Sequence, residues 1–181
     1  MKSIRGPFSL ERVVQSFDNV RHRLLRTVAV LRAADIPYAI VGGNAVALWV
    51  SRADPEAVRT TRNVDILLRR DDLVRARAAL EANGFTHCVV AGVDMFLDGP
   101  DASPRSAVQV IFANEKVHGQ ETLANPDVTD SEETDVCRVL TLDALVRIKL
   151  TTFRDHDRTH LRDLIHVGLL IAVGQVGSRS S

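Results

Sequence analysis

The chain has 181 residues, with 23 basic and 23 acidic side chains and a formal net charge of zero. A chain of this length buries most of its apolar surface without disulfides or metals, and its neutrality argues against a general polyanion binder, although a local basic patch stays open. No apolar run approaches the roughly 20 residues of a membrane span. Cys88 and Cys137 form no CxxC pair. We therefore expect a cytoplasmic protein with two buried thiols and no membrane partner.

A long amphipathic helix is predicted over residues 9–34, where apolar side chains recur at three- and four-residue spacing. Ser9 stands where an N-cap is expected. We interpret the arginines on the other face of this helix as solvated, with contact to an anion or nucleic acid as the alternative.

The sheet core is predicted over residues 36–140, where short apolar runs are broken by turn residues. The expected strands cover residues 38–41, 64–68, 85–90, 95–97, 107–112 and 136–140. Helices are expected over 44–51 and from Asp71 or Asp72 to Ala82. Residues 114–135 end in an acidic cluster, which we interpret as a solvated loop or helix end because it lacks the ligand spacing of a calcium loop.

A helical C-terminal section is predicted over residues 141–173. Thr141 is expected to cap its first helix, and a final helix is expected from Arg158 to Val173. The order of elements predicts an α/β (α+β) fold, a mixed sheet flanked by helices, in one domain over residues 1–181.

Two histidines and two aromatic residues need a separate interpretation. His156 and His160 stand four residues apart, a spacing that can bind metal, but we expect them to be solvent-exposed or to cap a helix. We expect Trp49 and Phe153 in the core, because apolar residues surround the first and the second extends an apolar helix face.

A glycine pair, Gly42-Gly43, separates a predicted strand from a predicted helix and is followed by Asn44. Such a turn lets backbone N–H groups approach a phosphate at a helix N-terminus. The alternative is that the turn only needs a positive φ.

Asn63 and Asp65 stand two apart on a predicted strand and therefore share a face. Two aspartates at this spacing would share divalent cations, which prefer oxygen ligands. Asp65 is either such a site residue or an ion-pair partner of Arg62 or Arg69. Further along, Lys149 and Arg154 either meet phosphate charge or pair with Asp157 and Asp163.

Together these stretches resemble the nucleotidyltransferase (polymerase-beta-like) superfamily, and within it the AbiEii-type subgroup of small bacterial proteins. The resemblance spans roughly residues 36–170. The matching positions are Gly42, Gly43, Ala45, Arg59, Thr61, Asp65, Lys149, Leu150, Arg154 and Asp157.

The resemblance implies a nucleotidyltransferase-like fold, a nucleoside triphosphate and Mg²⁺. It assigns nucleotide binding to the following residues: Gly42, Gly43, Asn44, Arg59, Thr61, Lys149 and Arg154. It assigns metal binding and catalysis to Asp65 together with Asn63.

The chain departs from the family pattern at two acidic positions. Asn63 stands at the first, and Gln109 stands where the third is expected. Both offer only neutral carbonyl oxygens, so the site falls from three negative charges to one. Mg²⁺ binding is then weak or absent unless Asp94 or Asp98 supplies a carboxylate.

Two functions follow from this pattern. The first is transfer of a nucleoside monophosphate from a triphosphate to a hydroxyl acceptor. The second is a catalytically depleted binding or regulatory module, similar to one half of a toxin–antitoxin pair, with a protein partner or as a homodimer. The sequence leaves open the acceptor, the base preference and contact with nucleic acid.

Overall fold

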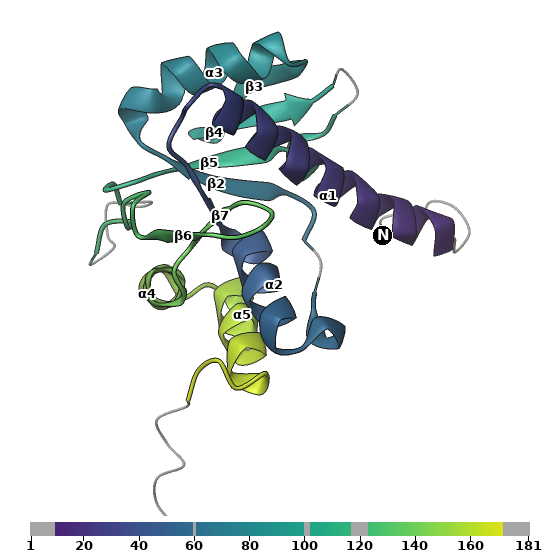
Figure 1. Ribbon diagram of the computed structural model, residues 1–181, viewed down its shortest axis with the longest axis vertical. Helices are drawn as coiled ribbons and strands as arrows, with labels where there is room; N and C mark the ends of the chain where they lie inside the picture. The colour runs from purple at the N-terminus through teal and green to yellow at the C-terminus, as the bar shows by residue number, and fades with distance from the viewer. Residues whose placement is uncertain (1–9, 60, 100–101, 117–122, 172–181) are drawn as a thin grey trace, which may run out of the picture.

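The computed structural model describes residues 10–59, 61–99, 102–116 and 123–171 (Figure 1). Its centre is a seven-stranded mixed sheet in the order β3-β4-β5-β2-β1-β7-β6. The strands are β1 Ala39–Val41, β2 Val64–Leu68, β3 Phe85–Val90, β4 Val93–Asp98, β5 Val108–Phe112, β6 Ser131–Glu133 and β7 Arg138–Leu140. The helices are α1 Leu10–Ala33, α2 Gly42–Ala53, α3 Leu73–Ala82, α4 Leu142–Thr152 and α5 Asp155–His166. Three 3₁₀ turns cover Pro55–Ala57, Arg70–Asp72 and Pro104–Ser106.

The helices form two groups around the sheet. α1 packs with α3 and against β2 and β5, whereas α2, α4 and α5 pack against one another (Figure 1). The apolar residues of the central strands lie between them, and Ile40, Ile66 and Leu67 are fully buried. Strands such as β2, which is apolar at every position except Asp65, suit a sheet that is covered on both faces.

Strand register decides which side chains share a face of the sheet. Asp65 on β2 pairs with Gln109 on β5, which pairs with Met95 on β4, so these three lie in one row on one face. Asp94 and Asp98 are one and three residues away from Met95 and therefore project from the opposite face. α1 covers that opposite face, since Arg26 of α1 pairs with Asp98.

The predicted α/β fold with a mixed sheet and flanking helices is confirmed. β2 and β3 begin and end where the sequence predicts, and the Thr141 hydroxyl accepts a hydrogen bond from the backbone N–H of Ala144 at 3.4 Å. The predicted cap Ser9 lies outside the described residues. Within the described part of the chain, no helix combines the length and the apolar character needed to cross a membrane.

Two element predictions are wrong. The final helix runs from Asp155 to His166, so it begins and ends earlier than the predicted range of 158–173. Residues 172–173 of that range lie outside the described residues. Residues 131–133, predicted as part of a polar loop or helix end, form strand β6, which pairs antiparallel with β7. Ion pairs of Glu132 with Arg52 and of Glu133 with Arg32 hold these charged residues in place.

Several predicted side-chain environments also change. Phe153 is 48% exposed rather than in the core, because it takes the left-handed conformation (φ 42°) that ends α4. Arg23, expected on a solvated face, is only 7% exposed. Cys137 is buried but Cys88 is only partly so. Trp49 packs partly buried against the core, and its Nε1 donates to the carbonyl of Leu140 at 3.0 Å.

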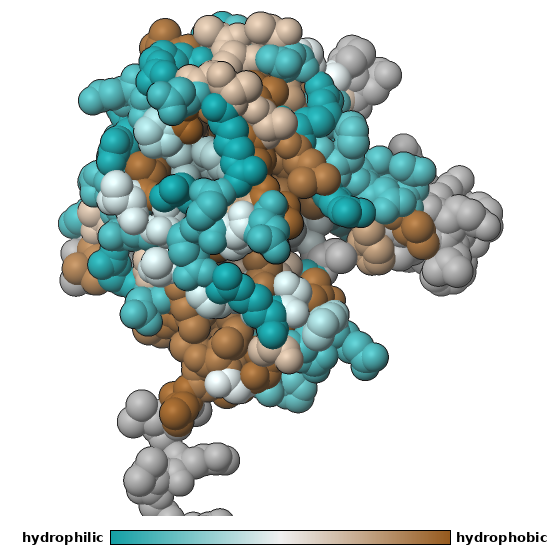
Figure 2. Space-filling model, in the orientation of Figure 1, coloured by the Kyte–Doolittle hydropathy of each residue, from teal (hydrophilic) through white to brown (hydrophobic). Residues whose placement is uncertain are grey.

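The surface in Figure 2 is largely hydrophilic, with apolar side chains gathered at its lower end over α5 and the segment that follows. Ile165 of α5 is 40% exposed, and Ile171, which follows this helix in the chain, is 88% exposed.

Candidate functional site

A cavity of about 630 Å³ lies between the Asp65 row of the sheet and helices α4 and α5. It brings together most of the residues that the sequence singled out, from three distant parts of the chain. Those that line it are Gly42, Gly43, Thr61, Asn63, Asp65, Lys149 and Arg154. Asn44 and Arg59, also predicted, are not part of its lining. Asn44 instead donates from Nδ2 to the carbonyl of Asn63 at 2.7 Å, and Arg59 pairs with Asp163 at 3.0 Å.

The Gly42-Gly43 turn is shaped around Asp65. Gly42 has a φ of +64°, and a Cβ placed there would lie 2.0 Å from Oδ2 of Asp65. The backbone N–H of Gly43 donates to the same carboxylate. The first turn of α2 therefore already faces an anion of this chain, and glycine at position 42 is required both by its φ and by this close approach.

Asp65 ends a short chain of hydrogen bonds along the strand. The hydroxyl of Thr61 donates to Oδ1 of Asn63 at 3.0 Å, and Nδ2 of Asn63 donates to Oδ1 of Asp65 at 2.6 Å. Burial raises the pKa of Asp65 to about 6, although the charge of Lys149 and the hydrogen bond from Gly43 act in the opposite direction. Neither Arg62 nor Arg69 pairs with Asp65, since Arg69 pairs with Asp127, so the ion-pair alternative is wrong.

The residues around Asp65 do not fit a site for two divalent cations. Asn63 uses its carbonyl oxygen for Thr61 and turns its amide N–H toward Asp65. Asp98 leaves the sheet on the other face and pairs with Arg26, and Asp94, although it is part of the cavity lining, pairs with His87 at 2.8 Å. No group of three or more His, Cys, Asp or Glu side chains able to hold a metal occurs among the described residues. Asp65 and Asn63 as ligands of one weakly held cation stay a prediction.

Asp157 organises the opposite wall of the cavity. It is fully buried and accepts hydrogen bonds from Nζ of Lys149 at 2.9 Å, the hydroxyl of Thr152 at 2.7 Å and Nε of Arg154 at 3.0 Å. Burial alone would raise the pKa of Asp157, but these donors hold it far below its ordinary value. Lys149 and Arg154 therefore both pair with Asp157, which was the predicted alternative to phosphate contact. The side chain of Arg154 nevertheless remains 47% exposed at the cavity.

Two histidines of α5, predicted to be solvent-exposed or to cap a helix, line the cavity, and of the two only His156 is exposed. The rings of His156 and His160 approach edge to face with centroids 6.0 Å apart. Burial, reinforced by the charge of Lys149, lowers the pKa of His160 to about 4, and its Nδ1 is buried without a hydrogen-bond partner among the described residues. Their i, i+4 spacing signalled a shared helix face, but not that the face points into this cavity.

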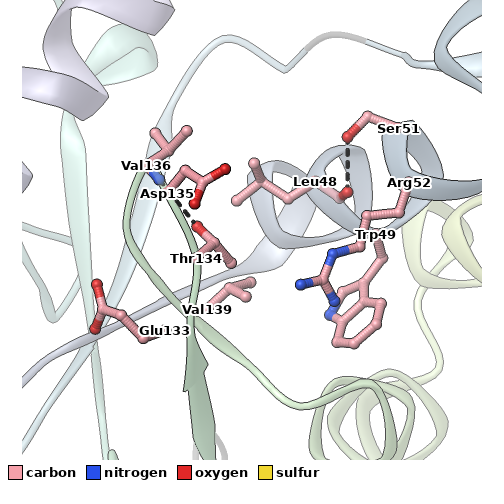
Figure 3. Close-up of a pocket in the computed structure, with 9 residues that line it drawn as sticks. All are labelled: Leu48, Trp49, Ser51, Arg52, Glu133, Thr134, Asp135, Val136 and Val139. Atoms are coloured by element: carbon pink, nitrogen blue, oxygen red, sulfur yellow. Dashed lines mark hydrogen bonds between the residues drawn. The ribbon is translucent and has the colours of Figure 1, made fainter.

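A smaller cavity of about 330 Å³ lies between α2 and the turn from β6 to β7 (Figure 3). It contains none of the predicted site residues. Arg52 stacks over the ring of Trp49 at 4.8 Å and also pairs with Glu132, and the hydroxyl of Thr134 accepts the backbone N–H of Val136. These polar groups already satisfy one another, so the Asp65 cavity is the stronger candidate site.

Comparison with known proteins relates the chain to others through its fold. No protein-family model matches the sequence, and no curated protein matches it. Among solved structures, an antigenic nucleotidyltransferase-like protein from Paracoccidioides brasiliensis superposes with a TM-score of 0.53 at 16% identity, over 84% of this chain and 76% of that one.

The antibiotic-resistance factor ANT(2'')-Ia is also similar. Its solution structure superposes with a TM-score of 0.57 at 10% identity, over 84% of this chain and 86% of that one. Its crystal structure in complex with adenylyl-2''-tobramycin gives 0.50 at 12% identity, over 82% and 87%. At these identities the likeness concerns the fold, and the chain has a nucleotidyltransferase-like fold with its own side chains around Asp65.

Proposed function

We propose that this chain binds a nucleotide in the Asp65 cavity and that the two-metal transfer chemistry expected of its fold is depleted. The observation that carries the proposal is the set of side chains facing the cavity at the expected acidic positions. Asp65 is ionisable there, whereas Asn63 and Gln109 are neutral amides. One carboxylate whose pKa is raised toward neutrality offsets little of the charge of two divalent cations.

The size and lining of the cavity support a nucleotide as the ligand. A volume of about 630 Å³ lies within the roughly 300–1,000 Å³ range of small-molecule sites. Four cationic side chains line it, Arg70, Lys116, Lys149 and Arg154, against the carboxylates of Asp65, Asp94 and Glu115. Arg154 is the cation we assign to a phosphate, because half of its side chain is exposed and a guanidinium binds phosphate through two parallel hydrogen bonds. ANT(2'')-Ia, whose fold is similar, was solved with an adenylyl compound.

Isothermal titration with ATP, GTP, CTP and UTP, with and without Mg²⁺, tests the proposal. We expect at least one nucleotide to bind with an affinity that changes by no more than about threefold with Mg²⁺, since few carboxylates hold the ion. Arg154→Gln should weaken binding about tenfold through loss of a charge-assisted hydrogen bond. Arg162→Gln, an exposed change on α5, the helix that begins directly after Arg154, and outside the cavity lining, should not. Failure of all four nucleotides to bind would overturn the proposal.

Nucleotidyl transfer to a hydroxyl is the second candidate, and the retained Asp65 beside the Gly42-Gly43 turn favours it. The double variant Asn63→Asp/Gln109→Asp examines the depleted positions directly. Two more carboxylates beside Asp65 repel one another, so the variant should unfold at a lower temperature than the wild type without Mg²⁺ and regain stability when Mg²⁺ is added. A variant indifferent to Mg²⁺ would show that these positions do not form the family's metal site. Transfer of label from α-labelled ATP by the wild-type chain would establish the second candidate.

A regulatory role for the depleted module, with a protein partner or a second copy of the chain, belongs to the same proposal. Sedimentation of the purified chain with and without the bound nucleotide measures whether it forms a homodimer.

A further inference from the structure

A second polar hollow lies between α1 and the described residues Asp98, Gly99 and 102–106, on the face of the sheet opposite Asp65. It consists of two cavities of about 440 and 500 Å³ that share the lining residues Asn19, Arg23 and Ser106. None of the residues of the Asp65 cavity contributes to either. Whatever this hollow binds is therefore separate from the proposed nucleotide site.

Arg23 is the unusual residue of this hollow. It is 7% exposed, and its Nε is buried with no hydrogen-bond partner among the described residues. Its contacts are long, 3.4 Å from Nη1 to the carbonyl of Arg62 and 3.7 Å from Nε to a carboxylate oxygen of Asp98. Asp98 pairs more closely with Arg26. A buried cation with an unused donor is costly, and a bound anion is one of the few ways to satisfy it.

The rim of the hollow adds positive charge and hydroxyl groups. Arg62 and Arg105 are exposed and form no ion pair within the described ranges, unlike most arginines of this chain. Asp98 is the one carboxylate among the described lining residues. The neutral polar groups of the lining are Gln15, Ser16, Asn19, Ser103 and Ser106, with His22 beside them. Among the described lining residues, three arginines against one carboxylate give a local positive excess.

We propose that this hollow binds a phosphate group. Nε of Arg23 donates to it from the buried side, and Arg62 and Arg105 donate from the rim. Guanidinium groups match the geometry of phosphate oxygens, and the hydroxyls of the lining supply further donors. The phosphate belongs either to a small phosphorylated molecule or to the backbone of a short RNA, since both present the same anionic oxygens.

NMR detection of the arginine Nε–H groups tests the proposal at the residue concerned. Titration with inorganic phosphate should shift the Arg23 Nε–H signal in a saturable way. The double variant Arg62→Gln/Arg105→Gln, which changes two exposed residues and keeps Arg23, should weaken phosphate binding at least tenfold. The control Arg77→Gln/Arg162→Gln removes two exposed arginines that line neither part of the hollow. Thermal unfolding midpoints confirm that each variant is folded.

The outcomes separate the proposal from non-specific charge. An unshifted Arg23 signal, or equal losses in the two double variants, would overturn it. Titration with a decamer of adenylate RNA then identifies the source of the phosphate. Binding more than tenfold tighter than that of inorganic phosphate, lost in Arg62→Gln/Arg105→Gln, supports a nucleic-acid backbone, and equal affinities support a small phosphorylated ligand.

Discussion

Two aspartates near one cavity, Asp65 in its lining and Asp157 buried behind Lys149 on the other side, have opposite electrostatic environments. Asp157 touches the ammonium of Lys149 directly and accepts three further hydrogen bonds, from Thr152 and from the side chain and backbone of Arg154. Asp65 receives hydrogen bonds from a neutral amide and one backbone N–H, and Lys149 acts on it only through its charge. Burial raises the pKa of both carboxyl groups, but only Asp157 has donors enough to reverse the effect.

The difference explains why only one of these residues is suited to a site. Asp157 is committed to holding α4 against α5, and its charge is neutralised within the protein. Asp65 keeps a proton affinity near neutrality and faces a cavity, which is the pattern of a carboxylate available to a ligand. Lys149 acts on both aspartates: it neutralises the charge of Asp157 through a direct ion pair, and its charge lowers the pKa of Asp65.

The largest effect is expected from Asp157→Ala. The variant leaves the ammonium of Lys149 buried at 3% exposure without its counter-charge, which costs about 3–5 kcal/mol. Urea unfolding followed by circular dichroism measures the change in the free energy of unfolding. Asp155→Ala on the same helix is the control, because Asp155 is exposed and its pair with Arg158 is 3.5 Å long. Equal losses in the two variants would mean that the Lys149 pair does not hold these helices together.

Gly42→Ala should come next. The new Cβ would overlap the carboxylate of Asp65, and alanine is disfavoured at a φ of +64°, so we expect a loss of about 2–4 kcal/mol. Gly92→Ala is matched to it, because Gly92 also has a positive φ of +80° but its Cβ would meet nothing within 4 Å. The difference between the two losses in urea unfolding isolates the contact with Asp65. If Gly92→Ala costs as much, the approach of the turn to Asp65 is looser than it is in this structure.

Asp65→Asn tests whether the pKa of Asp65 is raised in the folded protein. The pKa of Asp65 is about 6 in the folded protein and 3.8 ordinarily, so the folded state binds the proton more tightly and stability falls as pH rises from about 4 to about 6. Above pH 6 the ionised carboxylate costs about 2–3 kcal/mol. The asparagine variant should therefore gain stability relative to the wild type as pH rises from 4 to 7.

Unfolding midpoints of the wild type and Asp65→Asn, measured at half-unit steps of pH, give this difference free of the other titrating groups. Asp157 has the opposite sign, since its depressed pKa gives stability that is present above pH 4 and is lost as pH falls further. A wild-type curve parallel to that of Asp65→Asn across the whole range would contradict the raised pKa of Asp65.

The strands that form the site could be predicted from the sequence, but the roles of the side chains at the ends of α4 and α5 could not. The apolar residues around Asp65 predict strand β2, and the alternation of side chains along a strand predicts the face on which Asp65 lies. The family resemblance predicts that Gln109 is near Asp65, and in the structure the two residues pair across β2 and β5. These features depend on neighbours in sequence and on strand register. The role of Asp157 depends instead on donors from the end of α4 and the start of α5, and Lys149 and Arg154 had equally good alternatives in phosphate contact.

Other misses have the same origin in tertiary contacts. Ser131–Glu133 has little β-propensity, yet it forms a strand because β7 offers an unpaired edge and arginines neutralise its carboxylates. Arg23 lies on the polar face of its helix by sequence, but it is buried beside Asp98 and the carbonyl of Arg62. Burial by residues that are distant in sequence leaves no pattern in the sequence around the buried side chain.

The smallest effect separates the contribution of a single donor to Asp157. Thr152→Val keeps the shape of the side chain but removes the hydroxyl that donates to Oδ2 at 2.7 Å, and we expect a loss of about 1 kcal/mol because three other donors remain. Thr151→Val is the matched control, since the Thr151 hydroxyl donates to the carbonyl of Arg147 and not to a carboxylate. A loss confined to Thr152→Val in urea unfolding, constant near neutral pH and shrinking only in strong acid where folded Asp157 itself takes up a proton, would show that the donor stabilises the ionised form. A loss independent of pH would assign the effect of Thr152 to packing, and would leave Lys149 and Arg154 as the groups that hold Asp157 in its charged state.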